Sequence, residues 1–102
     1  MSVASIALDA LNVGGGKKRP RATVHMVDDQ GNPAGSATVA GEFTGGAADP
    51  GASGVTDSNG RAILDSDNTK KRNLRFTFCV TDVTHASLTY VEVDNAVTCQ
   101  TY

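Results

Sequence analysis

Residues 74–83 (LRFTFCVTDV) alternate apolar and polar side chains, and this alternation narrows the choice of fold more than any other feature of the chain. Leu74, Phe76, Phe78 and Val80 occupy every second position. Because successive side chains of a β-strand point to opposite faces, this spacing puts the four apolar residues on one face. The segment is therefore predicted to be a strand with one buried face.

Other short segments carry the same signal and are separated by turns rich in Gly, Pro, Asn and Asp. Further strands are predicted at residues 3–11, 21–29, 36–44, 54–56, 61–65 and 96–102. Residues 13–21 (VGGGKKRPR) are interpreted as the link between the first two strands. The first segment also has the spacing of a helical face, with Val3, Ile6 and Ala10 in phase, so strand and helix both stay open there.

Seven strands in 102 residues predict an all-β, antiparallel β-sandwich that forms one domain over residues 1–102. The composition agrees, because 11 Gly residues and the frequent Thr favour turns and strands over long helices. Residues 1–13 lack the features of a signal peptide, and no segment is apolar for long enough to cross a membrane. The chain is then either cytosolic or, as we expect, a piece of a larger secreted protein with Met1 added.

The acidic turn Asp57-Ser58-Asn59-Gly60 is a candidate for Ca²⁺ binding, but the spacing of an EF-type loop and its distant Glu are missing. Asn-Gly is also a common hairpin turn, so we interpret residues 54–64 as a hairpin. The second acidic cluster, residues 65–68 (DSDN), is interpreted as a solvated loop. We therefore expect no metal and no other cofactor.

The two histidines, His25 and His85, are the only candidates for general base catalysis at neutral pH. No G-x-S-x-G elbow accompanies them, and Asp28 and Asp29 point to opposite faces of their strand. We therefore expect surface or hydrogen-bonding roles for both histidines, no catalytic residues and no enzyme activity.

Cys79 and Cys99 permit one disulfide between the sixth and seventh strands. It would close a loop of about 20 residues and stabilise the fold by about 3 kcal/mol. Strand phase complicates the pairing, because Cys79 points away from the face of Phe76 and Phe78 whereas Cys99 is in phase with Val97. A bulge or an outward-facing Val97 would remove the conflict.

Seven of the nine basic residues gather in two clusters, which are Lys17, Lys18, Arg19 and Arg21, and Lys70, Lys71 and Arg72. If the strands run up and down in order, both clusters lie at one end and the acidic turns at the other. A polyanion-binding patch, head-to-tail docking of neighbouring domains and simple solubilising loops all remain open. The net charge of −2 and the lack of interleaved aromatic residues disfavour nucleic acid, and no membrane insertion is expected.

Two sequence motifs carry a family resemblance. Asp28 or Asp29, Gly31, Pro33, Gly35, Ala37 and Val39 follow a D-x-x-G-x-P-x-x-G-A-x-V pattern with small shifts, and Thr56, Asp57, Gly60 and Ala62 follow T-D-x-x-G-x-A. With residues 83–90 (VTHASLTY), they make residues 20–102 resemble the bacterial immunoglobulin-like domains of surface adhesins, such as those of invasin and intimin, and of secreted hydrolases.

The resemblance implies a seven-stranded immunoglobulin-like sandwich in an extracellular or cell-surface protein. It implies a non-catalytic spacer or adhesive unit whose expected partners are neighbouring domains of the same chain and an extracellular polymer or surface glycan. The alternative is a substrate-binding accessory domain of a secreted protease or polysaccharide-degrading enzyme. The motifs are turn signals, so they bring no catalytic residue with them.

Overall fold

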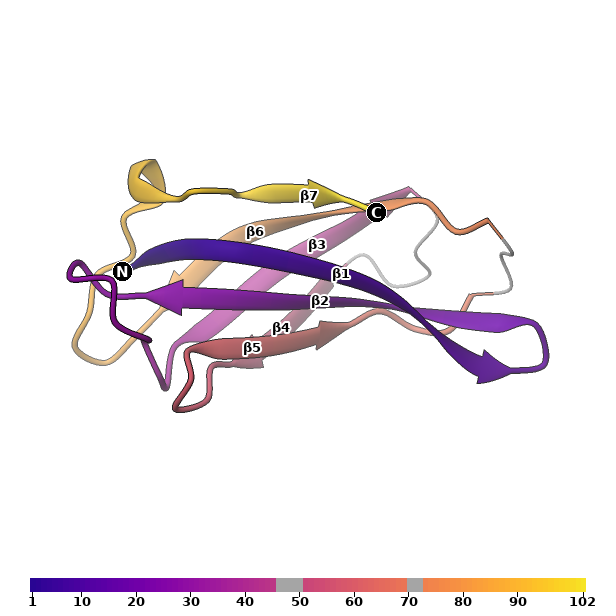
Figure 1. Cartoon of the computed structure of the whole chain (residues 1–102), viewed down its shortest axis with the longest axis horizontal. Helices are drawn as coiled ribbons and strands as arrows, with labels where there is room; N and C mark the ends of the chain where they lie inside the picture. Colours follow the sequence, from indigo (N-terminus) through magenta and orange to yellow (C-terminus); the bar gives the residue numbers. More distant parts are fainter. Residues whose placement is uncertain (46–50, 70–72) are drawn as a thin grey trace.

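The computed structural model describes residues 1–45, 51–69 and 73–102, and within these ranges the chain forms strands and a single 3-10 turn, without an α-helix. The strands are β1 (Ser2–Gly14), β2 (Lys17–Val27), β3 (Thr38–Gly45), β4 (Gly51–Val55), β5 (Arg61–Asp65), β6 (Phe76–Thr84) and β7 (Cys99–Thr101). The 3-10 turn, η1, is Glu92–Asp94 (Figure 1). The prediction of an all-β chain is confirmed.

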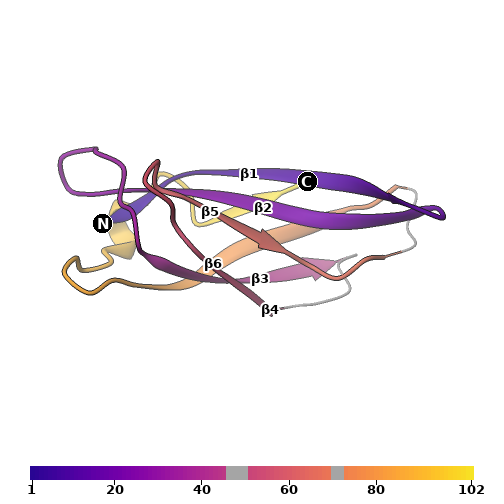
Figure 2. The same cartoon turned by 90° about the horizontal axis from the view of Figure 1, so that it is seen from below.

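The strands form two antiparallel sheets, one of three strands in the order β1-β2-β5 and one of four in the order β4-β3-β6-β7. Figure 2 shows the two sheets as separate layers. The chain passes from one sheet to the other after β2, after β4 and after β5. These crossings bring both inner faces onto a common core.

Apolar side chains at alternate positions of both sheets fill the space between the layers. Ala22, Val24 and Met26 of β2 are fully buried, and Phe43 of β3 packs between two rings of β6. The centroid of the Phe43 ring lies 5.8 Å from that of Phe76 and 4.9 Å from that of Phe78. Burial of each such ring contributes about 1.5–3 kcal/mol to the stability. The alternation predicted for residues 74–83 is thus confirmed.

β1 is a strand and not a helix, and it pairs with β2 along its whole length. A register shift between Val3 and Ser5 turns the start of β1 toward the C-terminal segment. There the Val3 N–H donates to Asn95 Oδ1 at 2.7 Å, and the Ala96 N–H donates to the Val3 carbonyl at 3.0 Å. The start of β1 therefore closes one side of the two-layer structure.

The link predicted at residues 13–21 is much shorter than expected. The turn between β1 and β2 is only Gly15 and Gly16, which both have positive φ as Gly14 before them does, and β2 already begins at Lys17. The basic cluster of residues 17–21 therefore lies in a strand, where alternate side chains point to opposite sides of the sheet. In Figure 1 this hairpin extends beyond the other strands at one end of the molecule.

The hairpin predicted for residues 54–64 is wrong. β4 pairs with β3, β5 pairs with β2, and the turn between them carries the chain from one sheet to the other. The backbone of Thr56 explains the outcome, because it bonds the segment before β3. Its carbonyl accepts from the Ser36 N–H at 3.0 Å and its N–H donates to the Ala37 carbonyl at 2.8 Å. Neither group is left to pair with β5.

Candidate functional site

Two acidic turns, at residues 28–32 and 57–61, share one hydrogen-bond pattern. The Oδ1 atom of Asp28 accepts from the N–H groups two and four positions later, both at 2.9 Å. The Oδ1 atom of Asp57 accepts from the equivalent groups at 2.9 and 3.1 Å. In both turns the backbone of the Asp also bonds the residues three and four positions on. Each of these carboxylates therefore organises its own turn.

Thr56 joins the two motifs that carry the family resemblance. Its side chain is only 4% exposed, and its hydroxyl donates to the Ala34 carbonyl at 2.7 Å while accepting from the Ala37 N–H at 2.8 Å. Both partners lie in the connection between β2 and β3, which carries the first motif. Because both are buried backbone groups, the hydroxyl satisfies polar atoms that would otherwise be costly.

Gly60 completes this contact, because a side chain at this position would collide with the backbone. A Cβ atom on Gly60 would overlap the carbonyl oxygen of Met26 and lie 3.0 Å from the Ala34 nitrogen. The Met26 N–H also donates to the Gly60 carbonyl at 2.7 Å. Thr56 and Gly60 are therefore needed for packing. Through them, the turn at residues 57–61 is fixed to the end of β2 and to the connection between β2 and β3.

The acidic cluster of residues 65–68 is used in contacts with β2. Asp65 forms an ion pair with Arg21, and Asn68 Oδ1 accepts from Arg19 Nε at 3.1 Å. Across the three described ranges, no group of three or more His, Cys, Asp or Glu side chains lies close enough together to hold a metal ion.

The prediction of a hydrogen-bonding role is confirmed for His85. Its Nδ1 accepts from the N–H groups of Ser87 and Leu88 at 2.9 and 3.0 Å. Nε2 must then carry the ring proton, and it donates to the Gly35 carbonyl at 3.0 Å. His85 thus ties the loop after β6 to the connection between β2 and β3. His25 is half-buried in β2 and aligned with Arg61 of β5.

Asn95 organises the C-terminal segment, and the sequence did not point to it. Its Nδ2 donates to the Tyr90 hydroxyl at 2.7 Å and to Thr98 Oγ1 at 3.0 Å. Its Oδ1 accepts from the Val3 N–H, so one side chain holds the first strand against the residues before β7. A single Asn in a polar loop has no local signal that would have identified this role.

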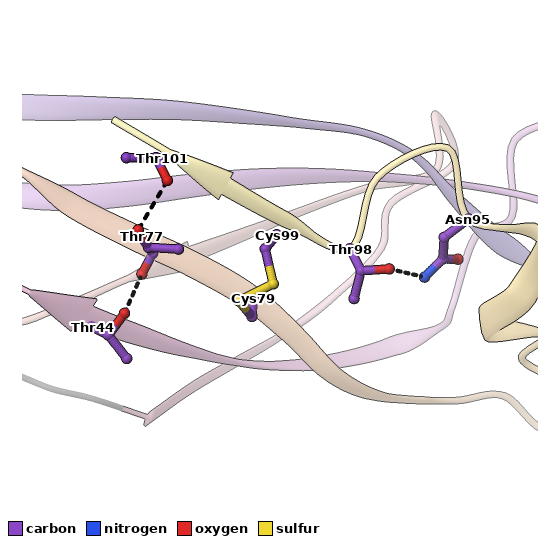
Figure 3. Close-up of a disulfide and its surroundings, with 7 residues drawn as sticks. All are labelled: Thr44, Thr77, Cys79, Asn95, Thr98, Cys99 and Thr101. Carbon is purple, nitrogen blue, oxygen red and sulfur yellow. Dashed lines mark hydrogen bonds between the residues drawn. A yellow bond between two sulfur atoms is a disulfide. The ribbon is translucent and has the colours of Figure 1, made fainter.

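The predicted disulfide between Cys79 and Cys99 is present (Figure 3). The two residues lie directly opposite each other in β6 and β7. The backbone bond from the Val80 N–H to the Thr98 carbonyl makes Cys79 and Cys99 a non-hydrogen-bonded pair, the position where cross-strand side chains are closest. Cys79 does point away from the core, and the phase conflict disappears because Val97, which packs against the core, lies before β7 and does not fix the direction of Cys99.

A row of threonines lies beside the disulfide on the same outer face. Thr44 of β3, Thr77 of β6 and Thr101 of β7 are neighbours in register. Thr77 Oγ1 lies 3.0 Å from Thr101 Oγ1, and the Thr44 hydroxyl donates to the Thr77 carbonyl at 3.5 Å (Figure 3). These contacts support β7, which is only three residues long.

The described members of the predicted basic patch, Lys17, Lys18, Arg19 and Arg21, differ in direction and in hydrogen-bond partners. Arg21 lies opposite Asp65 and forms a bidentate pair with it, with Nε–Oδ1 and Nη2–Oδ2 distances of 2.7 and 3.0 Å. The hydrogen bonds to Asp65 raise the pKa of the Arg21 guanidinium above its ordinary value, and the charge of Asp9 adds to the effect. The charge of Arg21 is therefore paired with that of Asp65.

The remaining predicted cations differ in position. Arg19 shares the outward direction of Arg21, and Lys17 is exposed at the tip of the hairpin. Lys18 instead shares the inward phase of Pro20 and Ala22. The second predicted cluster, Lys70, Lys71 and Arg72, lies outside the described residues.

Two hollows adjoin at this end of the molecule. One, of about 280 Å³, is lined by Lys18, Asn73, Leu74, Arg75 and Tyr102. The other, of about 370 Å³, lies along the hairpin and also touches Lys18. Arg75 and Tyr102 were not singled out from the sequence. The acidic turns and η1 lie toward the opposite end (Figure 1).

Comparison with protein-family models, with curated proteins and with solved structures finds no match. The described part of the chain also contains no helix long and apolar enough to cross a membrane.

Proposed function

We propose that the chain is a non-catalytic, immunoglobulin-like module that spaces or presents neighbouring domains of a bacterial surface or secreted protein. The observation that carries this proposal is the use made of its polar residues. Asp28, Asp57 and His85, the residues that most resembled catalytic or metal-binding groups, each bond nearby backbone groups. Their chemistry maintains loops and the contact between sheets.

The shape of the molecule also supports a spacing role. The described chain extends 43 × 23 × 18 Å, with the N-terminus toward the end that carries the acidic turns (Figure 1). The cross-strand disulfide suits an oxidising compartment, which supports an extracellular or cell-surface location.

The immunoglobulin-like topology is a part of what we propose. Two antiparallel sheets with crossings between them are the architecture that this class requires. In the constant-type arrangement, the fourth strand joins the sheet of the first, second and fifth. Here β4 joins β3, so the proposed module is a variant in which the fourth strand has changed sheets.

A second candidate function is substrate binding by an accessory domain of a secreted hydrolase. It is favoured by the polar hollow around Lys18 and Arg75, which has no structural role comparable to that of the acidic turns. The same chain could then position an enzyme on its polymeric substrate.

The two roles are separated by a sedimentation assay with insoluble cellulose, chitin and collagen. The control is an inert protein of equal net charge at the same salt concentration. If the chain is only a spacer, it should stay in the supernatant to the same extent as this control. Retention above that control supports the accessory role. Release of soluble sugar or peptide by the purified chain would contradict both, because it would show catalysis.

A further inference from the structure

The hollow lined by Lys18 and Tyr102 lies at the open mouth between the two sheets. Lys18 comes from β2 of one sheet, whereas Arg75 and Tyr102 flank β6 and β7 of the other. Leu74, which is 3% exposed, forms its floor. The site is thus built from both layers at the end where the apolar core stops.

Lys18 is unusual because it occupies an inward position of a central strand. Along β2 the same face continues with Pro20, Ala22, Val24 and Met26, which are all buried. A purely structural explanation is that the Lys18 stem covers the end of the core while its ammonium group reaches water. That explanation accounts for the position of the Lys18 methylene groups, but it gives no role to the ammonium charge.

The walls of the hollow are held by backbone hydrogen bonds. Lys18 and Thr69 exchange two of them, both at 2.7 Å. On the other wall the Tyr102 N–H donates to the Phe76 carbonyl at 2.8 Å, and the two rings stack with centroids 5.0 Å apart and planes 12° apart. Tyr102 remains 40% exposed, so an aromatic surface is still available to a ligand. The site is therefore largely formed before any ligand arrives.

Within the described residues, no side-chain carboxylate pairs with the cations of the hollow. Arg21–Asp65 is the one ion pair among the described residues, so neither Lys18 nor Arg75 has a carboxylate partner there. No acidic side chain is found among the described residues that line the hollow. Ammonium and guanidinium groups bind carboxylate and sulfate oxygens, and Asn73 adds an amide that both donates and accepts.

From these observations we infer that the hollow binds one acidic unit of a saccharide chain, with its carboxylate or sulfate on Lys18 and Arg75 and its ring against Tyr102. The volume of about 280 Å³ is near the lower end of ligand pockets, which suits a single sugar unit. The adjoining hollow along the hairpin would hold the next unit. Nucleic acid is disfavoured because Tyr102 is the one aromatic side chain among the described residues that line the two hollows, so successive bases would have no further ring to stack on.

This inference rests on the second proposed role, and its test is a calorimetric titration of the 102-residue chain. The probes are a trigalacturonate and a heparin tetrasaccharide, with a neutral maltotriose and a single-stranded oligonucleotide for comparison. Binding of an acidic oligosaccharide is expected, with no measurable heat from maltotriose. Equal or tighter binding of the oligonucleotide would overturn the inference, as would the lack of binding to both acidic probes.

Three variants locate the site. R75Q and K18M are each expected to weaken the interaction roughly tenfold, since each removes a charged hydrogen bond. K18M keeps the apolar stem, so unchanged binding would mean that Lys18 only covers the core. R61Q is the matched control, because it removes an exposed arginine of β5 beside the acidic turn at 57–61. An equal loss in R61Q would show a net-charge effect and overturn the site.

Failure of the site and failure of the proposed function give different results. If neither acidic probe binds, the hollow is not a saccharide site and the spacer role stands. If a probe binds and is then cleaved, the site stands and the non-catalytic proposal is wrong. R75Q is the most informative variant, because Arg75 is exposed and its substitution leaves the core unchanged.

Discussion

Thr56 illustrates how a polar residue of the T-D-x-x-G-x-A motif acts on the fold. The residue is buried, and its hydroxyl joins two backbone groups of the connection between β2 and β3. No apolar side chain of the same shape can do this. A motif that looked like a turn signal in the sequence is therefore half of a contact between distant segments.

Substitution T56V should destabilise the protein by about 2–4 kcal/mol, because it leaves the Ala34 carbonyl and the Ala37 N–H buried without a partner. T56S keeps the hydroxyl and should cost only about 1 kcal/mol for the lost methyl group. Urea unfolding of the three proteins measures both values. Equal losses in T56V and T56S would show that the hydroxyl has no such role.

Gly60 and Gly31 offer a matched pair, because they occupy the same position in the two acidic turns and have φ values of 76° and 81°. G31A meets no atom within 4 Å, so it should cost only the backbone strain of about 1–2 kcal/mol. G60A adds a collision with the Met26 carbonyl and should cost about 3 kcal/mol or more. Thermal unfolding of the two variants measures the loss of stability in each. A loss in G31A as large as that in G60A would contradict the role of Gly60 in close packing against Met26.

β7 is a whole strand that is held in place by its contacts with other segments, as the turn at residues 57–61 is. It is three residues long and pairs with only one neighbour, β6. An edge strand of this length has few backbone hydrogen bonds of its own. The disulfide, the threonine row and the stacking of Tyr102 on Phe76 hold it in place.

The double substitution C79S/C99S should lower the free energy of unfolding by about 3 kcal/mol, since the closed loop has a sequence separation of 20 residues. In this variant, exchange of the amide protons of Val80 and Tyr102, which bond across β6 and β7, should accelerate more than exchange of the Met26 amide proton in the other sheet. Hydrogen exchange of the wild type under reducing conditions should reproduce the pattern. Uniform acceleration in both sheets would show instead that the bridge stabilises the molecule only globally.

For the molecule as a whole, the sequence was a good guide to strands and a poor guide to their neighbours. Alternation predicted the buried face of residues 74–83 because side-chain direction is a local property. The strand predicted at residues 54–56 overlaps β4 only at Gly54 and Val55, and the sequence left strand and helix open for β1. The partner of β4 could not be predicted, since it depends on which distant backbone groups Thr56 meets. The start of β2 was also missed, because Pro20 normally ends a strand. Pro20 is tolerated because the ladder between β2 and β5 ends at Arg21 and Asp65.

The same limits apply at the candidate site. Charge clustering drew attention to residues 17–21 but could not show that Arg21 is paired and that Lys18 points inward. Arg75 and Tyr102 join Lys18 only through the packing of the two sheets. The molecule thus has structural acidic turns at one end and a hollow lined by Lys18 and Arg75 toward the other.

Residue-resolved NMR during a titration with trigalacturonate tests this division of roles most directly. The largest shifts are expected at the amides of Lys18, Thr69, Asn73 and Tyr102, around the hollow. Unchanged shifts are expected in the turns at residues 28–32 and 57–61, whose N–H groups are already bonded. Largest shifts in those turns, or no shift around the hollow at saturating probe, would contradict this division of roles.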